Sequence, residues 1–329
     1  MRTHSLKVIV RPSLSFRYNE GMTIKEILNW GAEELAPSSD SPRVDAELIL
    51  GFVLKKSTTF LLAHNEQKIC SIKAWLYRRL IRKRKQGIPV AYLVGHKEFY
   101  FLDFIVNRNV LVPRPDTETL VDCVISYLKS EIRNPKSEIN SKSQIQNSKY
   151  SSSFEFRVSS FVLLDVGTGS GCIPISILKN VPGLRAMATD VSWRALRVAK
   201  KNARRLGVSD RIQFIWSDLL KDVRSDLFED QEVIMTANLP YLPDKISVSP
   251  ELTFEPSISL YGGSDGMNVY KRLFEQIQLI RPKAIFLELY EWQIALLGTR
   301  LLGYTIAWIK PMSGEARCLY LERSNERTK

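Results

Sequence analysis

The stretch Leu163-Leu164-Asp165-Val166-Gly167-Thr168-Gly169-Ser170-Gly171 decides the fold of this chain. Its apolar first half has the composition of a buried strand, and the glycines permit the backbone angles of a tight turn before a helix. A dinucleotide-binding fingerprint would have glycine or alanine at position 172, where this chain has Cys172, so the spacing does not fit NAD. The stretch predicts a strand, a glycine turn and a helix, which either bind another ligand or form only a tight turn.

Outward from this stretch, strand-like and helix-like segments alternate. Helices are expected at 192–206 and 267–280, and strands at 161–166, 185–189, 212–215, 232–237 and 284–289. This alternation predicts an α/β fold with a mostly parallel sheet and helices on both faces. In such sheets, ligands bind at the carboxyl ends of the strands.

Two acids follow at the ends of the next two predicted strands. Asp190 comes about twenty residues after the glycines, where a carboxylate can accept hydrogen bonds from two ribose hydroxyls. In Ser217-Asp218-Leu219, the carboxylate of Asp218 can accept from the exocyclic amine of an adenine. Either acid alone is more often a helix cap or a surface residue. The three strand ends together resemble the S-adenosylmethionine-dependent methyltransferase superfamily.

The tetrad Asn238-Leu239-Pro240-Tyr241 follows the fourth predicted strand and indicates the methyl acceptor. A planar amide nitrogen is a poor nucleophile, so an enzyme must hold its face toward the methyl group. The side-chain oxygen of Asn238 and the backbone carbonyl of Leu239 can accept the two amide hydrogens. Pro240 stiffens the turn, and Tyr241 can cover the planar group. Alone, the tetrad would suit a strand-terminating turn; after three nucleotide-type signals we interpret it as a substrate clamp.

A chain of 329 residues exceeds the roughly 250 residues of a single core, so we expect two domains. Residues 22–88 have helical periodicity with breaks at Pro37, Pro42 and Gly51, and Thr23 stands three residues before Glu26 as in a capping box. This predicts a small helical domain.

The composition changes after this helical domain. Residues 89–112 are aromatic and β-branched with a turn at Asn107-Arg108-Asn109, which predicts a β-hairpin linker. Residues 113–325 would form the second domain. Its first helix is expected to begin within 113–118, where prolines and acids favour a helix start.

Two segments lie outside this plan. Residues 1–21 have no clean period, and Met22 directly precedes the capping box. We expect an extension that is disordered or, if Met22 is the start, not translated. Residues 129–160 contain three imperfect seven-residue units with one isoleucine each, too few apolar positions for a coiled coil. This segment is predicted to be a disordered, low-complexity insertion.

The composition also narrows the class of protein. Cys70, Cys123, Cys172 and Cys318 lie far apart without a histidine cluster, so the sequence indicates neither a zinc site nor a disulfide framework. No apolar run approaches the roughly 20 residues that span a bilayer. We expect a soluble cytoplasmic protein without a metal or a membrane partner, and a monomer by default.

A net charge of +12 favours an anionic partner. The densest cluster is Arg78-Arg79-Leu80-Ile81-Arg82-Lys83-Arg84-Lys85, with six cations in eight positions. Such a cluster is either a solvated helix face or a surface that meets RNA or a ribosome-bound partner, and the sequence leaves both open.

Taken together, the motifs resemble the HemK/PrmC family of protein-(glutamine-N5) methyltransferases. The resemblance covers about Met22 to Glu322 outside the insertion, and it rests on residues 89–95, 98–100, 112–118, 165–172, 238–241, 254–256, 262–266 and 314–317. It implies a class I, Rossmann-like, mostly parallel seven-stranded sheet with S-adenosyl-L-methionine as cofactor. It also implies a helical domain that docks peptide chain release factors, whose Gly-Gly-Gln glutamine is the acceptor.

The resemblance implies residue roles as well. The cofactor site would be lined by Gly167, Thr168, Gly169, Ser170, Gly171, Asp190, Asp218 and Leu219. Asn238 would touch both cofactor and glutamine, and the substrate site would be completed by Leu239, Pro240, Tyr241 and Arg114. Three positions depart from the family pattern: Leu239 replaces proline, Asp116 replaces glutamate and Tyr290 replaces glycine.

The expected chemistry is a direct in-line methyl transfer in which positioning and electrostatics supply the catalysis without a strong general base. We assign no catalytic role to His4, His64 or His96. Two alternatives stay open. One is methylation of an adenine exocyclic amine in RNA or DNA, and the other is an inactive cofactor-binding protein that grips the release factor.

Overall fold

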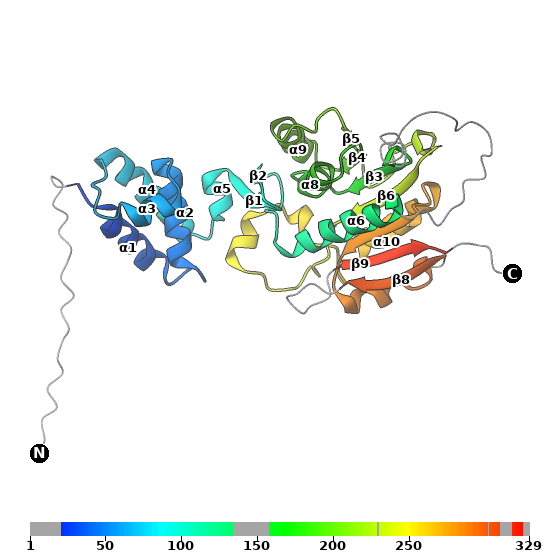
Figure 1. Cartoon of the computed structure of the whole chain (residues 1–329). Coiled ribbons are helices and arrows are strands. Elements are labelled where there is room, and N and C mark those ends of the chain that lie inside the picture. The colour runs from blue at the N-terminus through cyan, green and yellow to red at the C-terminus, as the bar shows by residue number, and fades with distance from the viewer. Residues whose placement is uncertain (1–20, 134–157, 229, 302, 310–317, 325–329) are drawn as a thin grey trace, which may run out of the picture. The chain divides into compact units, whose positions relative to one another are not determined.

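The computed structural model describes residues 21–133, 158–228, 230–301, 303–309 and 318–324. Its elements fall into two units that divide between Val94 and Gly95 (Figure 1). The prediction for residues 1–20 and that for residues 134–157 of the insertion lie outside the described part of the chain.

The first unit is helical, as its periodicity predicts. It consists of α1 (Ile24–Leu35), α2 (Pro42–Leu54), α3 (Thr58–Ala63), α4 (Ser71–Lys85) and α5 (Val90–Val94). The predicted capping box begins α1: the Glu26 N–H donates to Thr23 Oγ1 at 3.2 Å, and the Thr23 N–H donates to Glu26 Oε2 at 2.8 Å. The predicted break at Gly51 is wrong. Gly51 lies inside α2, where a Cβ would come within 2.8 Å of the Lys56 carbonyl oxygen.

The basic cluster of α4 is not one solvated face. Arg84 is buried, with its Nε 2.7 Å from Asp45 Oδ2 of α2. Lys85 forms an ion pair with Glu34 of α1 at 2.8 Å. The cluster therefore combines helix packing with a smaller exposed group that includes Arg79 and Arg82.

The second unit begins with a hairpin of β1 (His96–Phe99) and β2 (Leu102–Ile105), which is shorter than predicted. The chain reverses at Tyr100 and Phe101, with φ of 50° and 58°, and not at residues 107–109. Consecutive positive φ angles define a type I′ turn, which usually selects Asn-Gly. Here α6 (Asp116–Arg133) holds the turn, because the Tyr100 N–H donates to Glu118 Oε1 at 2.9 Å and its hydroxyl donates to Asp122 Oδ1 at 2.6 Å.

A seven-stranded sheet follows, in the order β5-β4-β3-β6-β7-β9-β8. Among these described strands, β9 alone runs in the opposite direction, so it pairs antiparallel with both β7 and β8. The strands are β3 (Phe161–Val166), β4 (Arg185–Asp190), β5 (Ile212–Trp216), β6 (Glu232–Ala237), β7 (Ala284–Glu288), β8 (Tyr304–Ile309) and β9 (Cys318–Arg323). The predicted mostly parallel sheet is confirmed, and the five predicted strands agree with β3 to β7 within one residue at each end.

Helices cover both faces of this sheet. They are α6, α8 (Cys172–Asn180), α9 (Trp193–Arg205) and α10 (Asn268–Gln276), with 3₁₀ turns η1 (Ser225–Phe228), η2 (Pro250–Phe254), η3 (Ser257–Ser259), η4 (Ile277–Leu279) and η5 (Glu291–Leu301). Residues 129–133, predicted to open the insertion, instead complete α6, because the buried Ile132 belongs to its apolar face.

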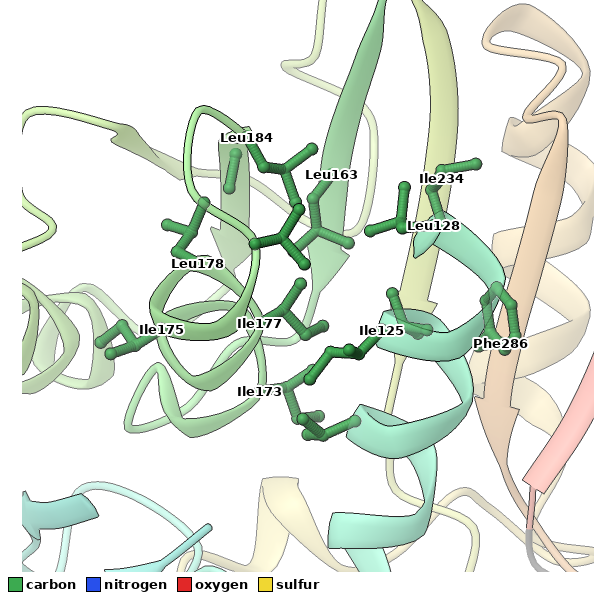
Figure 2. Close-up of a cluster of buried hydrophobic side chains, with 14 of the residues drawn as sticks. Ile125, Leu128, Leu163, Ile173, Ile175, Ile177, Leu178, Leu184, Ile234 and Phe286 are labelled. Carbon is green, nitrogen blue, oxygen red and sulfur yellow. The ribbon is translucent and has the colours of Figure 1, made fainter. Parts of the chain in front are cut away.

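The core lies on both sides of the central strand. Figure 2 shows Leu163 of β3 among side chains of α6 and α8, including Ile125 and Ile177. Leu164 points to the other face, where it belongs to a cluster with Leu273 of α10. Because both faces of β3 are covered, the strand reads as a continuous apolar run, which explains why the sequence identifies it so clearly.

Candidate functional site

The carboxyl ends of β3, β4, β5 and β6 surround one cavity of about 400 Å³. The fold thus brings together residues as far apart in the chain as Arg114 and Pro240. The predicted residues in its wall are Gly167, Thr168, Gly169, Ser170, Asp190, Asp218, Leu219, Asn238, Leu239, Pro240 and Arg114. Gly171 and Tyr241, which were also predicted, do not line it.

The glycines of the turn have different structural roles. Gly169 has a φ of 56° and lines the cavity, and a Cβ there would meet no protein atom within 4 Å. Gly171 has a φ of 80°, and its Cβ would lie 3.2 Å from Ala199 Cβ. Gly169 therefore leaves space for a ligand, whereas Gly171 permits α8 to pack against α9.

Asp190 holds the glycine turn as well as lining the cavity. Its Oδ2 accepts the Gly169 N–H at 2.8 Å, and its Oδ1 accepts the Ser192 N–H at 2.8 Å. Burial raises the pKa of Asp190, and the two backbone donors oppose this effect. Each carboxylate oxygen has a second lone pair, so Asp190 can still accept from two ribose hydroxyls while it organises the loop.

Asp218 and Leu219 close the cavity at the end of β5. Asp218 Oδ2 accepts from Lys221 Nζ at 2.7 Å and forms an ion pair with Arg272. These two cations lower the pKa of Asp218, Lys221 having the larger effect. Leu219 has a φ of 60°, which few non-glycine residues adopt. The two cations thus favour the charged form of the Asp218 carboxylate, at the position where the sequence predicts an acceptor for the exocyclic amine of an adenine.

The centre of the site is the amide of Asn238. Its Nδ2 donates to Glu288 Oε2 at 2.9 Å and to Thr117 Oγ1 at 3.1 Å. Both amide hydrogens are therefore used by protein acceptors, which assigns the amide orientation and leaves Oδ1 as an acceptor. Glu288 is 3% exposed and ends β7, so a buried carboxylate sets the direction of the tetrad's first side chain.

Leu239 is held by packing and by its N–H. The N–H donates to the Tyr270 hydroxyl at 3.2 Å, and that hydroxyl donates to the Glu288 carbonyl at 2.6 Å. A Cβ on Gly167 would lie 2.6 Å from Leu239 Cδ2, so the leucine covers the glycine turn directly. A proline would have no N–H for Tyr270. The leucine replaces the stiffness of the proline ring with these contacts.

Replacing Leu239 with alanine is expected to destabilise the chain by about 2–3 kcal/mol, because it empties a buried position between Gly167 and the second core cluster. Urea unfolding followed by circular dichroism measures this change. Exposed Leu62 provides the control, since its truncation removes no buried contact. A Leu239→Ala chain as stable as the wild type would show that the loop does not depend on this packing.

Tyr241, the last residue of the tetrad, is held by hydrogen bonds at both its side chain and its backbone. Its hydroxyl donates to Glu288 Oε1 at 3.3 Å, and its carbonyl accepts from Gln293 Nε2 at 2.8 Å. Tyr290 packs edge-on against its ring, with centroids 5.3 Å apart and planes at 87°. This contact gives the family departure at position 290 a physical role, since a glycine would leave the Tyr241 ring without this neighbour.

The glycines of residues 262–266 allow backbone to pack on the tetrad. A Cβ on Gly262 would lie 2.5 Å from the Pro240 carbonyl oxygen, and one on Gly266 would lie 2.2 Å from the Tyr241 carbonyl oxygen. Side chains at these two positions would displace the tetrad. Glycine is therefore required at these two positions because the tetrad backbone lies so close to them. The sequence alone does not reveal this reason.

Arg114 is positioned by Glu255. The two form an ion pair in which the Glu255 side chain is fully buried and Arg114 remains partly exposed at the cavity wall. Glu255 Oε2 also accepts the Val112 N–H at 2.9 Å. Burial raises the pKa of Glu255, and the Arg114 charge opposes this effect. The pair joins the segment before α6 to the loop before η3.

Sequence reasoning missed several residues of the site, foremost Glu288, Tyr270 and Thr117. Glu288 ends an apolar strand, and an acid at a strand end was the signal already used for Asp190. Thr117 and Tyr270 carry no such signal, because each acts through a hydrogen bond to a residue more than 30 positions away.

Within the described residues, no group of three or more His, Cys, Asp and Glu side chains could hold a metal ion, and no helix has the length and apolarity to cross a membrane.

The strand order, the glycine turn and the tetrad at the carboxyl edge define a class I methyltransferase domain. Residues 26–95 match the PrmC N-terminal domain, and residues 152–238 match the methyltransferase small domain. The release factor glutamine methyltransferase of Koribacter versatilis is 32% identical over 280 residues, which are 83% of this chain and 88% of that protein. The chain belongs to the release factor glutamine methyltransferase family.

One further sequence relative and one solved structure are similar to this chain. The bifunctional methyltransferase of Rickettsia bellii is 34% identical over 267 residues, which are 77% of this chain and 45% of that protein. This chain thus spans about half the length of that bifunctional relative. Among solved structures, the N-terminal domain of human METTL16 in complex with SAH is 15% identical, with a TM-score of 0.44 over 84% of this chain and 94% of that one.

Proposed function

We propose that this chain transfers a methyl group from S-adenosylmethionine to the side-chain amide nitrogen of the glutamine in the Gly-Gly-Gln motif of peptide chain release factors. The observation that carries the proposal is the fixed amide of Asn238. With both Nδ2 hydrogens bonded to Glu288 and Thr117, its Oδ1 is the group that can accept a hydrogen from an incoming amide. Membership of the release factor glutamine methyltransferase family supports the same acceptor.

The cavity fits the cofactor in size and in chemistry. Its volume of about 400 Å³ suits a nucleoside-sized ligand. Gly169 leaves space beside Asp190, and the buried Thr189 hydroxyl in the cavity wall has no hydrogen-bond partner among the described residues. Gly169, Asp190, Asp218 and Leu219 would hold the cofactor. When bound, it supplies an electrophilic methyl group on a positively charged sulfur.

The residues of the tetrad supply position rather than proton transfer. Asn238 Oδ1 and the Leu239 carbonyl accept the two amide hydrogens and so orient the face of the nitrogen toward the cavity. Formation of the nitrogen–carbon bond would break the bond between the methyl carbon and the sulfur, and one amide proton would pass to solvent, which restores the neutral amide. Glu288 keeps Asn238 in the required orientation, and its buried carboxylate is already bonded to Asn238 and Tyr241.

Transfer of labelled methyl from S-adenosylmethionine to a purified release factor tests this proposal. The parallel acceptors are a Gly-Gly-Ala variant of the factor and total RNA. We expect label on the wild-type factor and none on the variant. Label on RNA alone would assign the chain to the nucleic-acid alternative, and cofactor binding without label on any acceptor would identify an inactive binding protein.

A further inference from the structure

A second cavity lies on the second unit beside the one that holds the tetrad. Its volume is about 380 Å³, and it lies between the loop after β2 and the solvent face of α9. Asn109 lines both cavities, so the second opens next to the first. Its wall consists of Asn107, Arg108, Asn109, Trp193, Arg194, Arg197, Val198 and Lys201.

The charge of this cavity is unbalanced. Four of its eight wall residues are cations and none is an acid. Within the described residues, none of these four forms an ion pair. On the same helix, by contrast, Arg205 of α9 forms an ion pair with Asp103. Four uncompensated cations around one hollow attract an anionic ligand.

The spacing of the cations suits a chain of phosphates. Arg194, Arg197 and Lys201 stand at positions i, i+3 and i+7, which share one helix face. They therefore extend over about 10 Å of helix axis at 1.5 Å per residue. A single bound phosphate would need only one or two of them, whereas a strand with several phosphates can use all three.

Aromatic and amide groups in the cavity favour RNA over an acidic protein. The Trp193 side chain is 50% exposed, with the Arg194 and Arg197 guanidinium groups 5.6 Å and 5.4 Å from its ring centroid. Aromatic rings and guanidinium planes stack on unpaired bases, which acidic peptides lack. Asn109 Nδ2 donates to Asn107 Oδ1 at 2.9 Å, which directs two amides into the wall where a ribose 2′-hydroxyl can bond.

We propose that the cavity formed by Arg108, Trp193, Arg194, Arg197 and Lys201 binds a single-stranded segment of RNA. The phosphates contact the cations of α9, and a base stacks on the Trp193–arginine group. This site is separate from the methyl-transfer site and does not depend on which acceptor that site uses. Its position, with Asn109 shared, places bound RNA at the entrance of the catalytic cavity.

Two double variants of α9 test the proposal. Arg197→Gln with Lys201→Gln removes two charges from the cavity, and Lys200→Gln with Arg204→Gln removes two charges from exposed positions of the same helix outside it. The probe is a fluorescein-labelled oligouridylate, with binding measured by fluorescence anisotropy at several salt concentrations. We expect the cavity variant to bind at least about tenfold more weakly and its salt slope to fall by about 1.4, which is 0.7 for each lost phosphate contact. The control variant should bind within about twofold of the wild type.

Further variants separate charge, stacking and folding. Trp193→Ala is expected to weaken binding by about tenfold with an unchanged salt slope, because it removes stacking alone. Arg108→Gln removes a cation of the cavity from the loop and not from α9. It therefore tests the same site even if the α9 variant melts at a lower temperature than the wild type. Equal losses in the two double variants, or no binding by the wild type, would overturn the proposal. So would equal affinity for DNA of the same sequence or for an oligoglutamate peptide.

Discussion

Asn238→Ala is expected to lower kcat for methyl transfer by about 10²- to 10³-fold, the usual effect of removing one positioned hydrogen-bonding group at a reacting centre. The variant loses the oxygen that orients the acceptor amide. It also leaves Glu288 Oε2 and Thr117 Oγ1 without the donor that they share. The dissociation constant of the cofactor should change much less than kcat, because the cavity wall is otherwise intact.

The matched control is an asparagine that lies outside the site. Asn180 ends α8, where its Nδ2 donates to the Ser176 carbonyl at 2.9 Å, and it does not line the cavity. Asn180→Ala should retain wild-type kcat. Single-turnover kinetics with saturating cofactor, together with calorimetric titration of the cofactor, separate the two parameters. If Asn238→Ala keeps kcat within tenfold of the wild type, the amide of this residue does not orient the acceptor.

Arg84→Ala is expected to destabilise the helical unit by about 3–5 kcal/mol, because it leaves the carboxylate of Asp45 buried without its cation. The Arg84 and Asp45 side chains are 4% and 9% exposed, and Ser39 Oγ also donates to Asp45 Oδ2 at 2.7 Å. Hydrogen exchange of peptides from α2 and α4 in the full chain measures the local free energy of unfolding.

The neighbouring ion pair provides the matched control. Lys85 follows Arg84 on α4 and pairs with Glu34 of α1, but these two side chains are 47% and 39% exposed, so Lys85→Ala should cost less than about 1 kcal/mol. Replacing both Arg84 and Asp45 with leucine should recover much of the lost stability, since buried ion pairs are often no better than apolar residues of similar size. A destabilisation by Arg84→Ala no larger than that by Lys85→Ala would show that burial does not strengthen this interaction.

Local signals made the sheet predictable. Each strand from β3 to β7 is a short segment with apolar residues at half or more of its positions, and Asp190 and Asn238 stand at or just after strand ends. Parallel strands place their carboxyl ends at one edge, so residues at successive strand ends must approach one another. The position of both motifs at the cavity therefore follows from the chain alone, without knowledge of side-chain contacts.

The hairpin shows where such reasoning fails. Asn107 and Asn109 have the residue type of a turn, and they do form a local one, in which the Asn109 N–H donates to Asn107 Oδ1 at 3.0 Å. The strands instead reverse at Tyr100 and Phe101, which have no turn preference. Glu118 and Asp122 of α6 stabilise that reversal through hydrogen bonds from Tyr100, and these contacts exist only in the folded chain.

The amino-acid sequence by itself determined the alternating strands and helices, the glycine turn and the positions of Asp190 and Asn238. These features depend on residue type and on spacing over a few residues. Only the tertiary structure decided the orientation of the Asn238 amide, the support of Leu239 by Tyr270 and the hollow beside α9. Each of these depends on side chains far apart in sequence, and the distances between such groups are set by the packing of the sheet and its helices.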